Sequence, residues 1–214
     1  MKKTLIAFVL VVVSYSLFAQ SMPSAKQSRT KIGLKAGYNW SYATANESGV
    51  TLNGKSGYMV GAFLAPPHRG ILGYRTEIIY SRQGYSFDNG GKNTEVLNDY
   101  IYLPQLTTFS IGKFFQLQVG AQIGYLVNSK KTTASKDSSM LDLMNRLDYG
   151  FAAGIELNPI AGLIIGGRYN LGLGKMYKSY QASSNNPYPY PLPFNPSSTN
   201  LKNGVIQIFI GYKF

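Results

Sequence analysis

The stretch "FQLQVGAQIGY", residues 115–125, alternates two kinds of side chain. Its apolar set is Phe115, Leu117, Val119, Ala121, Ile123 and Tyr125, and its small or polar set is Gln116, Gln118, Gly120, Gln122 and Gly124. A period of two is typical of a β-strand. A soluble barrel would bury the apolar face and leave glycine and glutamine outside, where glycine weakens a strand without any packing return. In a narrow membrane barrel the apolar face meets lipid and small or polar side chains fill the lumen, so the stretch predicts a membrane strand.

Seven other segments show similar alternation and are rich in Tyr, Phe, Ile, Val and Gly. We expect eight strands, at residues 31–42, 56–65, 71–82, 99–109, 114–127, 148–157, 162–173 and 204–214. Helix-type spacing occurs only in residues 140–147, which predict one or two turns within a loop.

The connections between these strands alternate in length. Those after the second, fourth and sixth strands are short, whereas the others are long, at residues 43–55, 83–98, 128–147 and 174–203. Transmembrane barrels have such tight periplasmic turns and long outer loops. We therefore predict an all-β fold, an eight-stranded antiparallel up-and-down transmembrane β-barrel at residues 31–214 with both termini periplasmic.

The amino terminus has the pattern of an export signal. Lys2 and Lys3 precede an apolar run from Leu5 to Val13, and small residues follow around Ala19. The run is shorter than the about 20 apolar residues of a membrane-spanning helix. We expect a signal peptide at residues 1–19 and a short periplasmic segment at residues 20–30.

Composition limits the class of protein further. The chain has no cysteine, which excludes a disulfide-stapled module and a lipidated cysteine anchor. Its formal net charge is +12, and its basic residues are scattered rather than clustered. An exported chain seldom meets nucleic acid, so we expect phosphate-bearing outer-membrane lipid, and not nucleic acid, as the acidic partner.

Short motifs along the mature chain resemble the outer-membrane β-barrel family of Bacteroidetes called PorT-like. They are "GYNWS" (37–41), "EIIYSRQGY" (77–85), "YIYLP" (100–104), "DYGFAAGIEL" (148–157), "RYNLGLG" (168–174) and the closing "GYKF" (211–214). The resemblance implies location in the cell outer membrane and recognition of the last strand by the barrel-assembly machinery, but no single activity. We assign the assembly signal to Ile208, Ile210, Tyr212 and Phe214, on the apolar face of that strand.

Charged residues also fall on the face predicted to line the lumen. They are Lys35, Arg75, Glu77, Glu156 and Arg168. Charges held in so narrow a space must pair or be hydrated. We favour a salt-bridge plug over a conducting or proton-relaying pore, and the pairing is left open.

Candidates for catalysis and ligand chemistry are weak. His68, the single histidine, lies in a short turn predicted to be periplasmic, away from the outer leaflet where a lipid-modifying Ser and His pair would be needed. Asp137, Asp142 and Asp148 lack the spacing of a calcium loop, and "GLGK" (172–175) lacks the glycine and hydroxyl residue of a phosphate loop. We expect no catalytic residue, cofactor or metal.

The last long loop interleaves prolines with Tyr188, Tyr190 and Phe194. Proline pre-sets an extended backbone, so the loop is ordered on a partner at low entropic cost, and exposed aromatic residues provide anchors. Residues 179–203 either bind a protein partner or cover the barrel mouth as a lid.

The expected function is therefore a non-enzymatic outer-membrane barrel with a structural, docking or assembly role, which includes a role in secretion. The alternatives are a narrow porin-like pore and a soluble lipocalin-like periplasmic binder.

Overall fold

The computed structural model describes residues 29–44, 52–68, 70–89, 92–133, 136–179 and 200–214. The predicted signal peptide and the loop residues Tyr188, Tyr190 and Phe194 lie outside these ranges. In the parts that are described, we find no helix with the length and apolar character of a membrane span.

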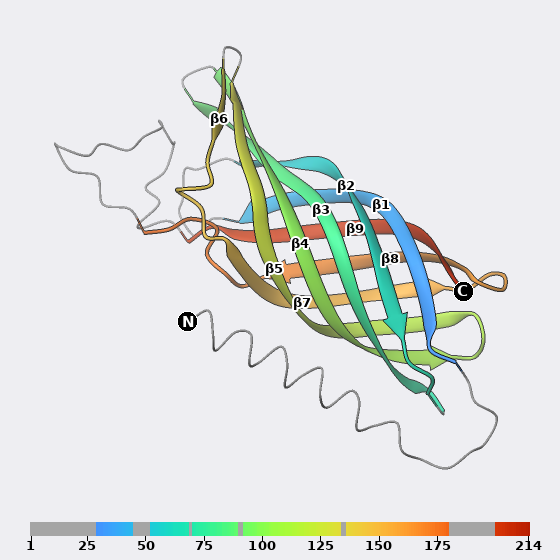
Figure 1. Ribbon diagram of the computed structural model, residues 1–214. Coiled ribbons are helices and arrows are strands. Elements are labelled where there is room, and N and C mark those ends of the chain that lie inside the picture. Colours follow the sequence, from blue (N-terminus) through green and yellow to red (C-terminus); the bar gives the residue numbers. More distant parts are fainter. Residues whose placement is uncertain (1–28, 45–51, 69, 90–91, 134–135, 180–199) are drawn as a thin grey trace.

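The described residues form antiparallel strands arranged in a closed ring (Figure 1). The strands are β1 (Lys31–Thr44), β2 (Leu52–Ala65), β3 (Leu72–Asn89), β4 (Lys92–Ile111), β5 (Phe115–Thr133), β6 (Lys136–Ser139), β7 (Leu147–Leu157), β8 (Leu163–Gly172) and β9 (Lys202–Lys213). Each strand pairs with its neighbour in sequence, except that β6 pairs only with β5 outside the ring and β7 pairs with β5. β1 pairs with β9 over twelve residues, from Gly33↔Lys213 to Thr44↔Lys202, and this closes the barrel.

The eight strands of the ring correspond to the eight predicted ones, so the predicted fold class is confirmed. Closure gives every strand of the ring two hydrogen-bonded neighbours, which is what a sheet needs in lipid, where water cannot satisfy an exposed edge. Three short turns join the strands at one end. Each contains a glycine with positive φ, namely Gly70, Gly112 and Gly162, a backbone conformation that L side chains rarely adopt.

An apolar belt surrounds the barrel. In β5, β7, β8 and β9 the outward positions hold large apolar side chains, and isoleucines 206, 208 and 210 of β9 are each about half exposed. Exposed tyrosines mark the belt's edge on the side away from the short turns; they are Tyr38, Tyr58, Tyr125, Tyr149 and Tyr169. Aromatic girdles of this kind lie at a membrane interface.

One wall of the barrel continues well beyond this aromatic edge. β3 and β4 remain paired out to Asn89↔Lys92, and β5 continues to Thr133 with β6 beside it (Figure 1). The predicted long loops at residues 83–98 and 128–147 are therefore largely strand, which corrects the sequence interpretation. Of the one or two turns predicted at residues 140–147, the structure has one, at residues 141–143, closed by a hydrogen bond from Leu143 N to Met140 O. Met144 then forms a β-bridge with Tyr177.

The interior has two chemically different parts. Polar and charged side chains, together with a few apolar ones such as Phe63 and Phe209, fill the part inside the apolar belt. Buried side chains that are mostly apolar, here called the apolar cap, fill the part towards the long loops. The apolar cap consists of Tyr85, Phe87, Val96, Leu126, Met140, Leu143, Met144, Met176, Tyr177 and Leu201. The expectation of a lumen lined by polar groups and glycine throughout is thus wrong for the outer part of the barrel.

Candidate functional site in the barrel lumen

The five charged residues predicted to face the lumen come together in one layer, here called the charged layer. They come from four strands, because Lys35 lies on β1, Arg75 and Glu77 on β3, Glu156 on β7 and Arg168 on β8. Alternation places every one of them on the inward face, and each is at most 3% exposed.

Glu77 is the centre of the charged layer. Lys35 Nζ donates to its Oε2 at 2.6 Å, and Arg168 donates through Nη1 at 2.6 Å to Oε2 and through Nη2 at 3.0 Å to Oε1. The two-pronged arginine contact matches the planar geometry of a carboxylate. Both side chains that surround Glu77 are themselves 0% exposed, so the interaction is shielded from water.

Glu156 holds the second half of the charged layer. Arg75 donates to it through Nη1 at 2.5 Å and Nη2 at 3.1 Å, and Gln118 Nε2 donates at 2.9 Å. Gln118 also accepts from Arg168 at 2.6 Å, which joins the two halves. With three cations and two carboxylates, the layer has a net charge of +1, and every cation in it contacts a carboxylate directly.

Sequence reasoning missed the neutral members of the charged layer. From the sequence, Gln118 could be recognised only as an inward polar residue. In the structure Gln118 and Arg168 both pair with Gly154, so they lie close together, but this strand register cannot be read from the sequence. Phe63 and Phe209 also point inward: the guanidinium of Arg75 lies 4.4 Å from the Phe63 ring centre and Lys35 Nζ lies 4.5 Å from that of Phe209. Phe209 is a large apolar side chain on the inward face of β9, and its cation–π contact with Lys35 explains why it is accommodated there.

A second layer of polar side chains separates the charged layer from the apolar cap. Asn39 donates to Ser81 Oγ at 2.8 Å and accepts from Gln207 at 3.1 Å, while Tyr102 donates to Asp148 at 2.8 Å. These bonds satisfy buried polar groups that would otherwise be costly.

At the far end, the buried phenols of Tyr85 and Tyr177 share a hydrogen bond within the apolar cap. They lie beyond the aromatic edge of the belt, and burial in apolar surroundings raises the pKa of each phenol well above its usual value.

The other predicted residues lie apart from this layer. His68 is exposed at the short-turn end. Asp148 is taken up by Tyr102, and within the described ranges no three acidic, histidine or cysteine side chains are grouped as a metal site would need. Ile208, Ile210, Tyr212 and Phe214 all face outward, with exposures of 52, 55, 48 and 73%.

Comparison with known families identifies the barrel. The model of the outer membrane protein beta-barrel domain matches residues 18–178, which is most of the chain. The chain belongs to this family. Membership of this family, together with the closed ring and the apolar belt, places the protein in the outer membrane, as predicted. That location excludes the soluble periplasmic alternative.

Solved structures of the same architecture match the outer-membrane β-barrel at low sequence identity. Neisserial surface protein A is 13% identical with a TM-score of 0.52, over 86% of this chain and 97% of that one. Ail, the attachment invasion locus protein of Yersinia pestis, is 17% identical with a TM-score of 0.49, over 87% of this chain and 100% of that one. The first of these similarities shows a shared fold and nothing about activity. The sequence has no significant match among curated proteins.

Proposed function

We propose that this barrel is a non-enzymatic outer-membrane protein with a structural, docking or assembly role, for example in secretion. We also propose that it belongs with the PorT-like barrels of Bacteroidetes. The observation that carries the proposal is the packing of the lumen. A side chain with 0% exposure has protein atoms on every side and borders no space that a water molecule can enter.

The charged layer and the apolar cap both oppose conduction. Lys35, Glu77 and Arg168 are fully buried, and an ion that crossed this layer would have to break contacts of 2.6 Å in a medium of low dielectric constant. Met140 and Met144, each 0% exposed, then fill the barrel interior further along. Two successive barriers of different chemistry favour a closed barrel over the narrow pore.

The position of the single histidine supports the non-enzymatic part of the proposal. His68 is the only histidine of the chain, and it lies on the side of the short turns. On this proposal the protein has three kinds of partner. Outer-membrane lipid contacts its outward face, the barrel-assembly machinery recognises its last strand, and a protein partner binds residues 179–203.

Planar-bilayer recording tests the proposal. We expect purified wild-type protein to give no single-channel steps. The double variant Glu77→Ala/Arg168→Ala removes the central carboxylate of the charged layer and the arginine that binds it through two hydrogen bonds, and should give more current than wild type. Regular steps from the wild-type protein would instead favour the pore. Crosslinking in intact cells, with identification of the captured proteins, tests the docking role.

A further inference from the structure

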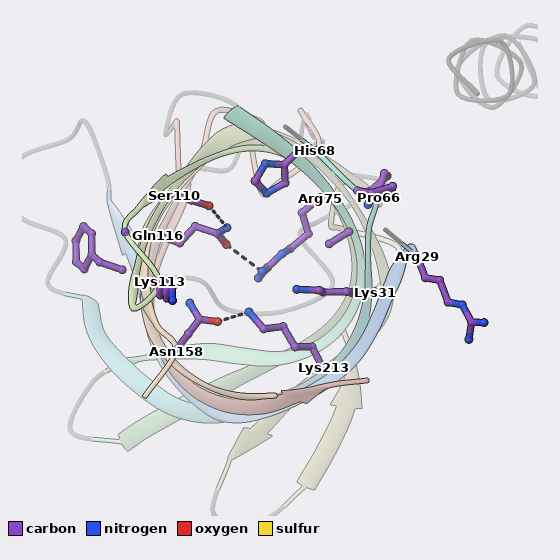
Figure 2. Close-up of a pocket in the computed structure, with 14 residues that line it drawn as sticks. Arg29, Lys31, Pro66, His68, Arg75, Ser110, Lys113, Gln116, Asn158 and Lys213 are labelled. Carbon is purple, nitrogen blue, oxygen red and sulfur yellow. Dashed lines mark hydrogen bonds between the residues drawn. The ribbon is translucent and has the colours of Figure 1, made fainter. Parts of the chain in front are cut away.

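The end of the barrel with the short turns contains a basic cavity of about 310 Å³. Lys31, Arg75, Lys113, Gln116, Asn158 and Lys213 are among its lining residues. Figure 2 shows the side chains of Lys31, Arg75 and Gln116 pointing into this cavity, while Arg29 points away from it. The part of the lining that the structure describes includes no carboxylate.

The positive charge around this cavity is only partly neutralised. Arg75 is neutralised by Glu156, but in the described residues Lys31, Lys113 and Lys213 have no carboxylate within 4.0 Å. Lys213 donates instead to the amide oxygen of Asn158. Three ammonium groups around one cavity repel each other, and a bound anion would relieve that repulsion.

A second cavity, of about 500 Å³, shares Lys31, Lys113, Asn158 and Lys213 with the first. Its other side is apolar, with Phe114, Ile160 and Phe214 exposed by 64, 66 and 73%. The lysines therefore stand between a polar well inside the barrel and an apolar rim at its edge. This combination suits a ligand that has a phosphate group next to a hydrocarbon part, as well as a phosphate group alone.

We propose that this end of the barrel is a phosphate-binding site, with Lys31, Lys113 and Lys213 as the charged groups and the side-chain amides of Gln116 and Asn158 as neutral donors. Lysine binds phosphate as a mobile point charge, and charge-assisted hydrogen bonds to phosphate oxygen are the strong ones. The phosphate belongs either to a phospholipid of the periplasmic leaflet or to a free phosphate in the periplasm. The site does not depend on whether the lumen conducts.

Two probes distinguish the sources. Sodium phosphate is titrated calorimetrically into the detergent-solubilised protein at constant ionic strength. In parallel, nanodiscs of phosphatidylglycerol and phosphatidylcholine are loaded with the protein, and native mass spectrometry measures which lipid is retained. We expect saturable binding in at least one arm, and the double variant Lys31→Gln/Lys213→Gln to weaken it by roughly tenfold or more, because two charge-assisted contacts are lost.

The matched control removes the same charge elsewhere. Lys130 and Lys175 are exposed near the opposite end of the barrel, so Lys130→Gln/Lys175→Gln should leave binding within about twofold of wild type. Binding of phosphate alone identifies a free-phosphate site, and retention of phosphatidylglycerol identifies a lipid site. Absence of saturable binding in both arms, or equal weakening in both double variants, would overturn the proposal.

Discussion

Replacing Glu77 by Gln tests whether the charged layer stabilises the barrel. The substitution keeps the size of the side chain but removes the charge that accepts from Lys35 and Arg168. The net charge of the layer rises from +1 to +2, since three cations then face one carboxylate. Breaking a buried ion pair by removing one partner costs about 3–5 kcal/mol, which is a large share of the roughly 5–15 kcal/mol that stabilises a typical domain.

The matched control is Glu95→Gln. Glu95 pairs with Lys55 on the extended wall, where the two side chains are 36 and 25% exposed. Solvent screens such a pair, and its loss costs at most about 1 kcal/mol. Both changes remove one carboxylate charge, so their difference isolates the effect of burial.

Unfolding by guanidinium in lipid vesicles measures the effect. Trp40, the single tryptophan, lies at the aromatic edge and reports unfolding by fluorescence, and the mobility of unheated protein on a denaturing gel gives a second readout. We expect Glu77→Gln to lower the unfolding free energy several times more than Glu95→Gln. Adding Lys35→Met to Glu77→Gln returns the layer to +1 and should recover part of the loss. Equal effects of Glu77→Gln and Glu95→Gln would refute the reasoning.

Three further outcomes follow from other regions. Deleting Phe214 should lower the amount of protein in the outer membrane several-fold, as measured by fractionation and immunoblotting. The control Phe114→Ser, which removes another exposed aromatic residue at the same end, should not lower it. Equal amounts of the Phe214 deletion and wild type would show that Phe214 is not part of the assembly signal. Changing Tyr188, Tyr190 and Phe194 to Ser should abolish the crosslinked partner if residues 179–203 dock it, and should raise antibiotic entry instead if they form a lid; no change in either would make the loop a spacer. The raised pKa of Tyr85 keeps its phenol neutral in the folded protein. The stability that this neutral phenol contributes is therefore complete below the unfolded-state pKa of about 10, and it is lost as the pH rises towards the folded-state pKa. The denaturation midpoint of wild type should therefore fall above about pH 10 more steeply than that of Tyr85→Phe, and parallel curves would contradict this.

The membrane-embedded part of the fold was predictable because one rule held for most of its residues, with inward Phe63 and Phe209 among the exceptions. Outward side chains meet lipid and inward ones meet a small polar space, so alternation of the kind seen in residues 115–125 has a single meaning there. Beyond the aromatic edge the rule reverses, because the outward face meets water and Tyr85, Phe87 and Val96 turn inward to the apolar cap. Because of this reversal, the sequence pattern did not predict that β3 continues to Asn89, and its last residues were interpreted as a loop.

The charged layer was predictable in membership but not in pairing. Parity places Glu77 and Arg168 inside the barrel, since each is next to an outward-facing side chain, Ile78 and Tyr169 respectively. Which cation meets which carboxylate depends on the stagger between strands, and that stagger is a property of the closed ring rather than of any one strand. The aromatic partner Phe209 was not predictable from the sequence, because alternation indicates that a residue points inward but not what it contacts.

The route from Glu77 to Arg168 bears on how the barrel folds. β3 and β8 are opposite each other in the ring, four strand spacings apart in either direction, and at about 4.8 Å per spacing a flat sheet would hold them roughly 19 Å apart. In the barrel their side chains meet at 2.6 Å. The ion pair therefore contributes nothing to a flat or partly curled sheet and appears only when curvature is nearly complete. If the ring closes after the folding transition state, the Glu77–Arg168 pair acts on the unfolding rate alone, and it then slows the opening of a finished barrel without speeding its assembly.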